Sequence, residues 1–460
     1  MSTARPARTF DRSLVEGPIG PAVWKIAWPT MLQNVIAGLQ GIIDHAMVGH
    51  FVGYTANAAI GVSWQIVIVV IVFASSVFSG MGVLVARFAG ANQPEKVNRV
   101  VYQAFLTAAG MSLALGAVGW LAAPSLLRLV NATPAVAAEA LPFLRAMLVG
   151  ILGMMIFFLL SGAFRAAGDA QTPLRLGVTM TVLTIAFNVV LIPRFGTLGA
   201  ALGTIGSSSI VSAWGLWRMR RPDSVIHLAP GMSMAPDLTI IRELFRFGLP
   251  TGVQGIAMNV AGVLLLRFIG SLPQSAESQA AYAVGYTELF SLITWTAVGL
   301  MGAAAAIAGQ NLGAGRPERV AEGVRVASRI GLCLAAAVGV IFLAVPNLLL
   351  AIFGMKDPVV LALGQQLLRY LALSGLFVTV ALCYTGALQG TGDTRGPLYI
   401  SIVSQIIVPL GLCAGLQAAG RLTAGGIWTA IVLGHMTRAG LSVARFRLQK
   451  WRSIQVAIPS

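Results

Sequence analysis

Three polar side chains share one face of an otherwise apolar stretch that begins near residue 22. The segment GIIDHAMVGH at 41–50 contains Asp44, and Gln33 and Gln40 precede this residue by eleven and four positions. At 3.6 residues per turn this spacing puts all three on one side of a helix. Removal from water disfavours the ionised form of a carboxyl group, so such an acid can bind and release a proton at physiological pH. The competing interpretation is a hydrated aspartate at a membrane surface, because His50 is only six residues away.

Two later stretches carry matching polar faces. Thr181, Thr184 and Asn188 are spaced i, i+3 and i+7, and a further set follows at Thr204, Ser207 and Ser208. We expect these side chains to form the opposite wall of the cavity that Asp44 faces. The alternative for each is a hydrogen bond between packed helices, worth about 0.6 to 2 kcal/mol in a membrane.

A second acidic side chain lies in the C-terminal half of the chain. Glu288 has Ser291 and Trp295 at i+3 and i+7. An acid beside an aromatic ring is a plausible site for a hydrophobic cation, since ring faces attract cations by about 0.5 to 2 kcal/mol. An ion pair with Arg267 or Arg369 is the alternative.

The composition places these faces in a membrane. Of 460 residues only 10% are charged and 57% are hydrophobic, and the mean hydropathy is +0.83, so the surrounding solvent must be largely lipid. Runs of roughly 20 apolar residues are long enough to cross about 30 Å of hydrocarbon. Twelve such runs are predicted, at 22–48, 57–86, 101–124, 141–164, 173–193, 198–217, 247–269, 280–308, 330–352, 363–389, 397–418 and 424–443. No removable signal peptide is expected.

The basic residues indicate the topology. The net charge is +16, and 24 of the 31 Lys and Arg fall on the side that holds the N-terminus. By the positive-inside rule both termini are predicted to be cytoplasmic. The charge therefore indicates a membrane protein and not a nucleic-acid partner. The abundance of Ala and Arg favours a bacterial plasma (inner) membrane.

Three segments recur along the chain at a nearly constant offset. SGAFRAAGDAQTPL at 161–174 aligns with TGALQGTGDTRGPL at 385–398, FAGANQPEKV at 88–97 with NLGAGRPERV at 311–320, and WPTMLQ at 28–33 with LPTGVQ at 249–254. This pattern predicts two parallel six-helix repeats. The predicted divisions are a cytoplasmic tail at 1–20, an N-terminal lobe at 21–217, a cytoplasmic linker at 218–242, a C-terminal lobe at 243–445 and a cytoplasmic tail at 446–460.

These segments carry a resemblance to a known family. The WP of the first span, DHAMVGHFVG at its end, GANQPEKV and RAAGDAQTP together look like the multidrug and toxic compound extrusion (MATE) family. The resemblance covers nearly the whole chain. It implies an all-α polytopic membrane protein with twelve transmembrane helices in a V-shaped pair of lobes. It also implies cation-driven antiport that exports amphipathic, often cationic, compounds.

The resemblance extends to single residues. Asp44 resembles the first-span aspartate used for proton coupling, Gln40 a polar residue of the cavity, Asn188 the fifth-span asparagine, and Pro29 the proline at which the first helix bends. The family has acidic residues in the fifth, seventh and tenth spans. At or near these positions the present chain has Ile192, Met258 and Val378. The chain thus resembles a proton-coupled, DinF-like branch, and sodium coupling is less expected.

Other functions are weighed against this one. A flippase for lipid-linked oligosaccharides shares the two-lobe plan but requires a strongly cationic cavity. Arg145, Arg267 and Arg369 are the residues that could contribute positive charge to such a cavity. A membrane receptor without transport is the other alternative. GTGD at 390–393 matches an intramembrane protease motif, but its repeat partner at 166–169 favours paired turn residues. No zinc, serine-protease or ATP-binding motif occurs, so we expect no enzyme and no cofactor.

A transporter of this kind also has expected partners. They are small amphipathic substrates and membrane lipid, and the protein is expected to be a monomer. Met154, Met155, Phe157 and Phe158 are predicted to face lipid, with a flexible substrate cavity as the alternative.

Overall fold

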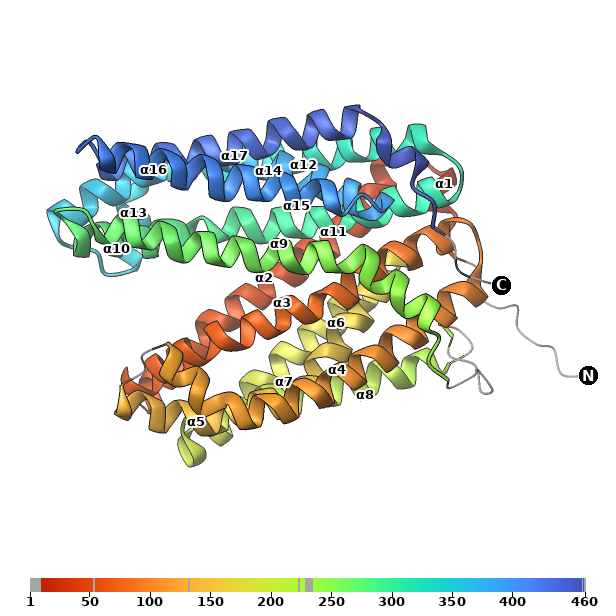
Figure 1. Cartoon of the computed structure of the whole chain (residues 1–460), viewed down its shortest axis with the longest axis horizontal. Helices are drawn as coiled ribbons and strands as arrows, with labels where there is room; N and C mark the ends of the chain where they lie inside the picture. Colours follow the sequence, from red (N-terminus) through yellow and green to blue (C-terminus); the bar gives the residue numbers. More distant parts are fainter. Residues whose placement is uncertain are drawn as a thin grey trace, which may run out of the picture.

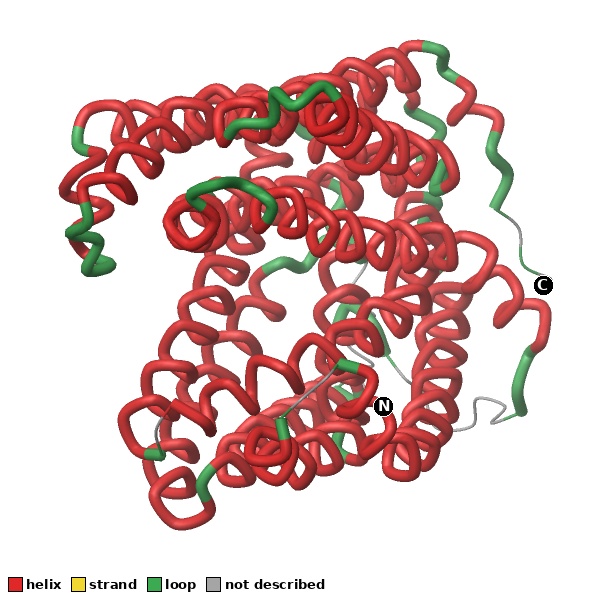
Figure 2. Tube along the Cα trace, turned by 60° about the vertical axis from the view of Figure 1, so that its left-hand side comes forward, coloured by secondary structure: helices red, strands yellow, loops and turns green. Residues whose placement is uncertain are grey.

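The computed structural model describes residues 10–52, 54–130, 133–221, 224–227, 235–456 and 458. Within these residues every regular element is a helix, and Figure 2 shows no strand in them. The first half contains a short helix and seven long ones: α1 (Ser13–Glu16), α2 (Ile19–Phe51), α3 (Tyr54–Gly90), α4 (Pro94–Leu129), α5 (Pro134–Val149), α6 (Ile151–Ala166), α7 (Gln171–Phe195) and α8 (Thr197–Met219).

The second half follows the same order with more interruptions. Its helices are α9 (Leu238–Gly270), α10 (Ser275–Tyr282), α11 (Ser291–Gly313), α12 (Pro317–Ala344), α13 (Pro346–Ile352), α14 (Pro358–Thr391), α15 (Arg395–Ser401), α16 (Val408–Ala418) and α17 (Ala424–Arg447). Two π-helical segments, η1 (Ala283–Leu289) and η2 (Ile402–Ile407), connect α10 to α11 and α15 to α16, and the 3₁₀ turn η3 (Lys450–Ser453) follows α17.

The helices account for the twelve predicted spans. Eight helical stretches among the described residues are long and apolar enough to cross a membrane, and the pair α5 and α6, bent by 50°, forms one more. The helices α2, α8 and α17 contain 33, 23 and 24 residues, which is also sufficient length. The chain is an all-α, multi-pass membrane protein with two six-helix lobes.

The structure differs from the predicted spans in three places. The fourth span is bent where Gly150 separates α5 from α6. The ninth span, 330–352, is not one helix, because α12 ends at Ala344 and Pro346 begins α13; proline cannot supply the amide that a continuing helix needs. Helix α9 begins at Leu238, inside the predicted linker, with the Asp237 carboxylate capping its first amides. Residues 1–9 of the predicted N-terminal tail, 222–223 and 228–234 of the predicted linker, and 457, 459 and 460 of the predicted C-terminal tail lie outside the described residues.

The internal repeat is visible in the helix boundaries. Pro94 and Pro317 begin equivalent helices 223 residues apart. Gly168 and Gly392 follow α6 and α14 with nearly equal φ angles of 98° and 101°, a conformation that glycine adopts without strain. In Figure 1 the two lobes lie close together on the side of the chain termini and diverge toward α5 and α10.

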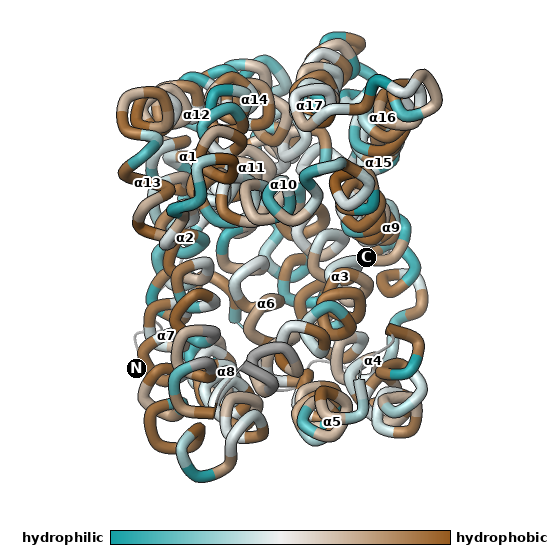
Figure 3. Tube along the Cα trace, turned by 90° about the vertical axis from the view of Figure 1, so that its left-hand side faces the viewer, coloured by the Kyte–Doolittle hydropathy of each residue, from teal (hydrophilic) through white to brown (hydrophobic). Residues whose placement is uncertain are grey.

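Helix α2 contributes to both lobes. The buried Val23 and Ile26, in its first half, share a hydrophobic cluster with Leu300 of α11 and Leu388 of α14. Its second half lies against α7 of the N-terminal lobe. Seen from the end in Figure 3, α2 runs along one flank of the molecule between the two groups of helices.

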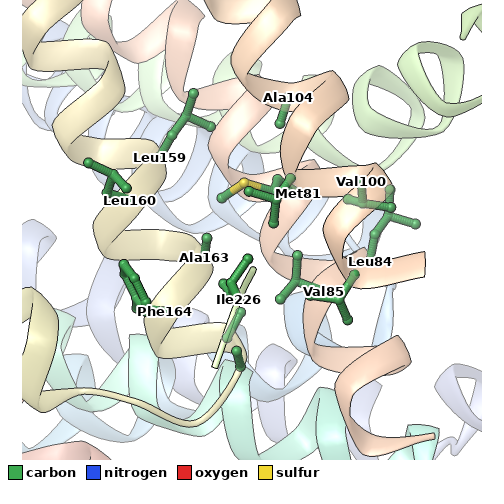
Figure 4. Close-up of a cluster of buried hydrophobic side chains, with 14 of the residues drawn as sticks. Met81, Leu84, Val85, Val100, Ala104, Leu159, Leu160, Ala163, Phe164 and Ile226 are labelled. Atoms are coloured by element: carbon green, nitrogen blue, oxygen red, sulfur yellow. The ribbon is translucent and has the colours of Figure 1, made fainter. Parts of the chain in front are cut away.

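Helix α9 makes the equivalent crossing in the opposite direction. Leu244 and Phe247 belong to the hydrophobic cluster of the N-terminal lobe. Figure 4 shows part of this cluster, with Met81 of α3 and Leu159 and Phe164 of α6. The two crossing helices therefore tie the lobes together by close van der Waals packing of apolar side chains, which is a main source of helix association in a membrane.

Glycines allow the crossing helices to lie directly against the neighbouring lobe. A Cβ on Gly248 of α9 would lie 1.6 Å from the carbonyl oxygen of Ser76 in α3, and one on Gly299 of α11 would lie 2.6 Å from the Cα of Met31 in α2. Contacts this short tolerate no side chain, so the backbones of the two lobes meet here. The α3–α9 and α2–α11 contacts are equivalent under the repeat.

Candidate functional site

The polar face of α2 meets the polar face of α7. Asn188 Nδ2 donates to Asp44 Oδ1 at 2.8 Å, and Thr181 Oγ1 donates to Gln40 Oε1 at 2.7 Å. Asp44 and Gln40 are half-buried, whereas Asn188 is fully buried. The structure thus brings together two pairs that the sequence periodicity placed on facing helices.

Gln33 extends the same face by two further turns. A Cβ on Gly177 of α7 would lie 3.1 Å from Gln33 Cγ, so the absence of a side chain at Gly177 lets the two helices pack closely. Gln33 is half-buried. Gln33, Gln40 and Asp44 therefore form a continuous polar stripe along α2 that follows α7.

The other predicted residues of α7 and α8 lie behind this stripe. The hydroxyls of Thr184 and Ser207 are 2.6 Å apart, and both residues are fully buried. Thr204 Oγ1 donates to the carbonyl of Ala200 in its own helix, and Ser208 Oγ donates to the carbonyl of Ile205. Thr184 and Ser207 thus form a hydrogen bond between packed helices, which was the alternative to a place in the cavity wall. Contact of Thr204 with a substrate stays a prediction.

Gly203 of α8 is a site residue that the sequence did not reveal. A Cβ at this position would lie 2.1 Å from Asn188 Oδ1. That oxygen is buried and accepts no hydrogen bond from the described residues. Because Gly203 has no side chain, the Asn188 amide can occupy the space beside it. The same amide donates a hydrogen bond to Asp44.

Glu288 lies in the π-helical segment η1. It is half-buried, and its backbone carbonyl accepts a hydrogen bond from Ser291 Oγ. Among the described residues it forms no ion pair with Arg267 or Arg369. A Cβ on Gly38 of α2 would lie 2.3 Å from the ring of Trp295, so this ring lies against the other lobe. A cation site at Glu288 stays a prediction.

Pro29 lies inside α2, where the helix is continuous from Ile19 to Phe51. A proline in a helix removes one hydrogen bond and weakens the helix locally. Pro29 is the eleventh of the 33 residues of α2: it follows Val23 and Ile26, which pack with the C-terminal lobe, and precedes the polar stripe. Its role as a hinge stays a prediction.

The predicted lipid-facing cluster of the fourth span is mostly internal. Met154, Met155 and Phe157 are buried in the N-terminal lobe, because the bend at Gly150 turns α6 into the bundle. Phe158 is 36% exposed and lines a cavity between the lobes. The prediction of lipid contact was wrong for these residues.

The two aspartates of the GD motifs hold turns. Asp169 Oδ1 accepts the amides of Gln171 and Thr172. Asp393 Oδ1 accepts the amide of Gly396 at 3.0 Å, and its Oδ2 accepts Arg445 Nε at 2.7 Å. The hydrogen bond with Asp393 raises the pKa of Arg445 above its usual value. Both carboxylates are occupied as helix caps, so the protease motif has no catalytic pair. Within the described ranges no group of three His, Cys, Asp or Glu could hold a metal ion.

Comparison with known proteins places this arrangement among membrane transporters. The MatE family model matches residues 29–190 and 250–414. The chain is 27% identical over 433 residues to the probable multidrug resistance protein NorM of Thermotoga maritima, covering 93% of this chain and 92% of that protein. It is 29% identical over 446 residues to the probable multidrug resistance protein NorM of Deinococcus radiodurans, covering 92% and 94%.

The fold also matches a solved structure. An outward-facing multidrug resistance MATE family transporter of the MOP superfamily superimposes with a TM-score of 0.90 over 97% of this chain and all of that one. The sequence identity is 20%, so this likeness establishes the arrangement of the helices.

Proposed function

Because the chain belongs to the MatE family of membrane transporters, which are not enzymes, we propose that it exports amphipathic, chiefly cationic, compounds in exchange for protons. Two relatives are named as probable multidrug resistance proteins, and these names support the export of drugs. The observation that carries the proposal is the Asp44–Asn188 hydrogen bond within a polar stripe that is only half-buried. A carboxylate in this position is accessible to a substrate and partly shielded from water.

Proton and substrate compete for the same charge in this proposal. The ionised Asp44 attracts a cation, and protonation removes that attraction. The Asn188 amide suits both states, since its N–H donates to a carboxylate and its carbonyl oxygen can accept from a carboxylic acid after rotation. The unpartnered Oδ1 of Asn188 supports this second role.

Helix α2 is proposed to link this exchange to the arrangement of the lobes. Its first half is anchored among apolar side chains of the C-terminal lobe, and its second half carries Asp44. Bending at Pro29 would let the segment that carries Asp44 move relative to the segment before the proline. One proton that moves down about 100 mV supplies about 2.3 kcal/mol, enough for roughly fifty-fold accumulation of substrate.

Protons are proposed as the driving ion because the acidic positions of the sodium-coupled branch carry apolar residues. Met258 lines a cavity of about 150 Å³ in the C-terminal lobe together with Tyr282 and His435. Ile192 and Val378 are buried. The side chains of Met258, Ile192 and Val378 contain no oxygen atom, and a sodium ion requires oxygen ligands.

The proposal includes a location and an oligomeric state. We place the protein in the bacterial plasma membrane as a monomer, with both termini cytoplasmic. The distribution of Lys and Arg supports this orientation. The orientation can be tested by fusing to the C-terminus a reporter enzyme that is active only in the periplasm. Activity of this reporter would contradict a cytoplasmic C-terminus.

Transport in everted membrane vesicles tests the function. A cationic dye should accumulate in vesicles that contain the wild-type protein when respiration acidifies the lumen, and the Asp44→Asn variant should lose this accumulation. The matched control is Glu322→Gln, which makes the same carboxylate-to-amide change at an exposed residue of α12 outside the stripe and should keep the accumulation. Unchanged transport by Asp44→Asn would reject the mechanism, and no transport by any protein would favour the receptor alternative.

The flippase alternative has less support at the arginines considered for it. The Arg145 guanidinium lies 4.7 Å from the Trp120 ring, and its Nε donates to the Trp120 carbonyl. Arg267 and Arg369 are exposed. The cationic cavity that this alternative needs is therefore not built from these three residues.

A further inference from the structure

A cavity of about 220 Å³ lies between the two lobes, and the internal repeat is visible in its walls. Helices α3 and α6 form one wall, and α11 and α14 form the other. Lining residues occur in pairs that are 223 or 224 positions apart, among them Phe78 and Met301, Val83 and Ala306, and Arg165 and Gln389. Equivalent residues from both lobes face the same space, so the cavity lies on the axis that relates the lobes.

The two sides of this cavity differ in charge. Arg165 is the one ionisable side chain among the lining residues. Its equivalent in the second lobe, Gln389, donates to Gln254 Oε1 at 3.2 Å, and Gln254 Nε2 donates to Ser401 Oγ at 2.7 Å. The C-terminal wall is therefore neutral and engaged in its own hydrogen bonds. The N-terminal wall presents a positive charge.

The charge of Arg165 is not neutralised within the described part of the chain. No hydrogen bond or ion pair joins its guanidinium to another described residue, and the nearby turn aspartates are engaged elsewhere: Asp169 caps α7 and Asp393 binds Arg445. A cation between packed helices loses hydration. A bidentate oxyanion would compensate for that loss, because the planar fork of arginine matches a carboxylate, sulfonate or phosphate.

Aromatic rings lie beside this charge. Phe78 and Phe158 both line the cavity, and their rings stack with centroids 5.8 Å apart. A charged group next to an apolar ring pair suits an amphiphile. The cavity volume of about 220 Å³ is below the usual range of about 300 to 1,000 Å³ for whole drug-sized ligands, so it suits a headgroup and its first ring.

We propose that Arg165 binds the oxyanionic group of an amphiphile while Phe78 and Phe158 cover its adjoining apolar part. The inference rests on the export function proposed above and widens its substrate class. Compounds that carry a carboxylate, sulfonate or phosphate, including zwitterions, are then ligands, in addition to the cations that Asp44 attracts. The single positive charge on the axis excludes a lone cation from this position by repulsion.

Binding to the full-length protein in phosphatidylcholine nanodiscs tests the proposal. The probes are 5-dimethylaminonaphthalene-1-sulfonate and the matching neutral sulfonamide, which share the ring system and differ in charge. The wild type should bind the sulfonate about tenfold or more tightly than the sulfonamide, since hydrogen bonds to charged groups are the strong ones. Arg165→Gln, which copies the residue of the opposite wall, should abolish this preference, and Arg165→Lys should retain part of it.

A matched variant controls for the loss of one positive charge. Arg267→Gln removes an exposed arginine that does not line the cavity and should keep the preference for the sulfonate. Equal binding of both probes by the wild type would overturn the proposal. A preference that persists in Arg165→Gln would also overturn it. These measurements need no proton gradient, so they separate loss of anion binding from failure of the transport proposed for Asp44.

The source of the oxyanion can be resolved in the same system. Replacement of phosphatidylcholine by phosphatidylglycerol, at a salt concentration that screens the membrane surface, supplies a competing anionic lipid. If sulfonate binding by the wild type weakens several-fold, a lipid headgroup occupies the site and supports a lipid phosphate as the ligand. If it does not change, the site takes the free amphiphile. Both results support an oxyanion site, provided that the sulfonate preference depends on Arg165.

Discussion

Replacement of Gly203 by alanine should disconnect Asn188 from Asp44. The new Cβ would lie 2.1 Å from Asn188 Oδ1, whereas ordinary contact begins at 3.4 Å, so the two groups must separate by about 1.3 Å. The surrounding α7–α8 contact is tight, because Thr184 and Ser207 are hydrogen-bonded and fully buried. The amide is therefore expected to move toward α2 or rotate, and in either case its 2.8 Å hydrogen bond to Asp44 loses its geometry.

The size of the effect follows from the bond that is lost. A hydrogen bond to a charged group contributes about 1.5 to 3 kcal/mol, which corresponds to roughly a ten- to 150-fold change in a binding constant. Without the donor the ionised carboxylate is less stabilised, and a cation then competes less well with the proton. The apparent affinity of the purified protein for a cationic dye at neutral pH should fall by up to this factor.

A double-mutant cycle isolates the cause. Gly203→Ala is compared with wild type, with Asn188→Ala and with the double variant, and Gly110→Ala in α4, where no atom lies within 4 Å of the new Cβ, serves as the control. If Gly203 acts through Asn188, the double variant should match Asn188→Ala, because the second change has nothing left to disturb. Additive effects of the two substitutions, or a Gly203→Ala protein that binds like wild type, would refute this reasoning.

Two further substitutions test hydrogen bonds that hold the helices together, one in each lobe. Thr184→Val removes the 2.6 Å hydrogen bond to Ser207 and should lower the free energy of unfolding by about 0.6 to 2 kcal/mol without loss of proton-coupled transport; loss of transport in a stable variant would instead place Thr184 in the substrate path. Asp393→Asn weakens the bond to Arg445 and should destabilise the protein by about 1.5 kcal/mol, the lower end for a charged hydrogen bond, because the Arg445 side chain is 32% exposed. Thermal unfolding in detergent measures both, and an Asp393→Asn protein as stable as the wild type would show that this pair contributes nothing.

The arrangement of the long helices could be predicted because it depends on features that the sequence shows directly. Membrane thickness sets the length of each apolar run, and the duplicated segments set the equivalence of the two lobes. The facing of Asp44 and Gln40 toward α7 followed from helical periodicity, since polar side chains avoid lipid. Asn188 and Thr181 were found by the same argument.

Other features depend on which surfaces meet, and this leaves little trace in a single sequence. The crossing of α2 and α9 into opposite lobes buries apolar residues such as Ile26 and Leu244. The sequence does not show which lobe such residues contact, because an apolar side chain can be buried equally well in either one. Gly203 is one of 52 glycines, and only its contact with Asn188 distinguishes it. Arg165 directly follows the predicted span 141–164 and was therefore one of the 24 basic residues counted on the side of the N-terminus, yet it lines the interlobe cavity. Alignment of the repeats, which pairs Arg165 with Gln389, was the one signal that could have identified it.

The central claim is that a proton and a cationic substrate compete for Asp44. It is tested most directly by the affinity of the purified protein for a cationic dye, measured between about pH 8 and about pH 5, a range in which a partly shielded carboxyl group can titrate. The affinity of the wild type should fall as the pH decreases, and that of Asp44→Asn should be weak and independent of pH. Equal pH dependence in both proteins would contradict the claim.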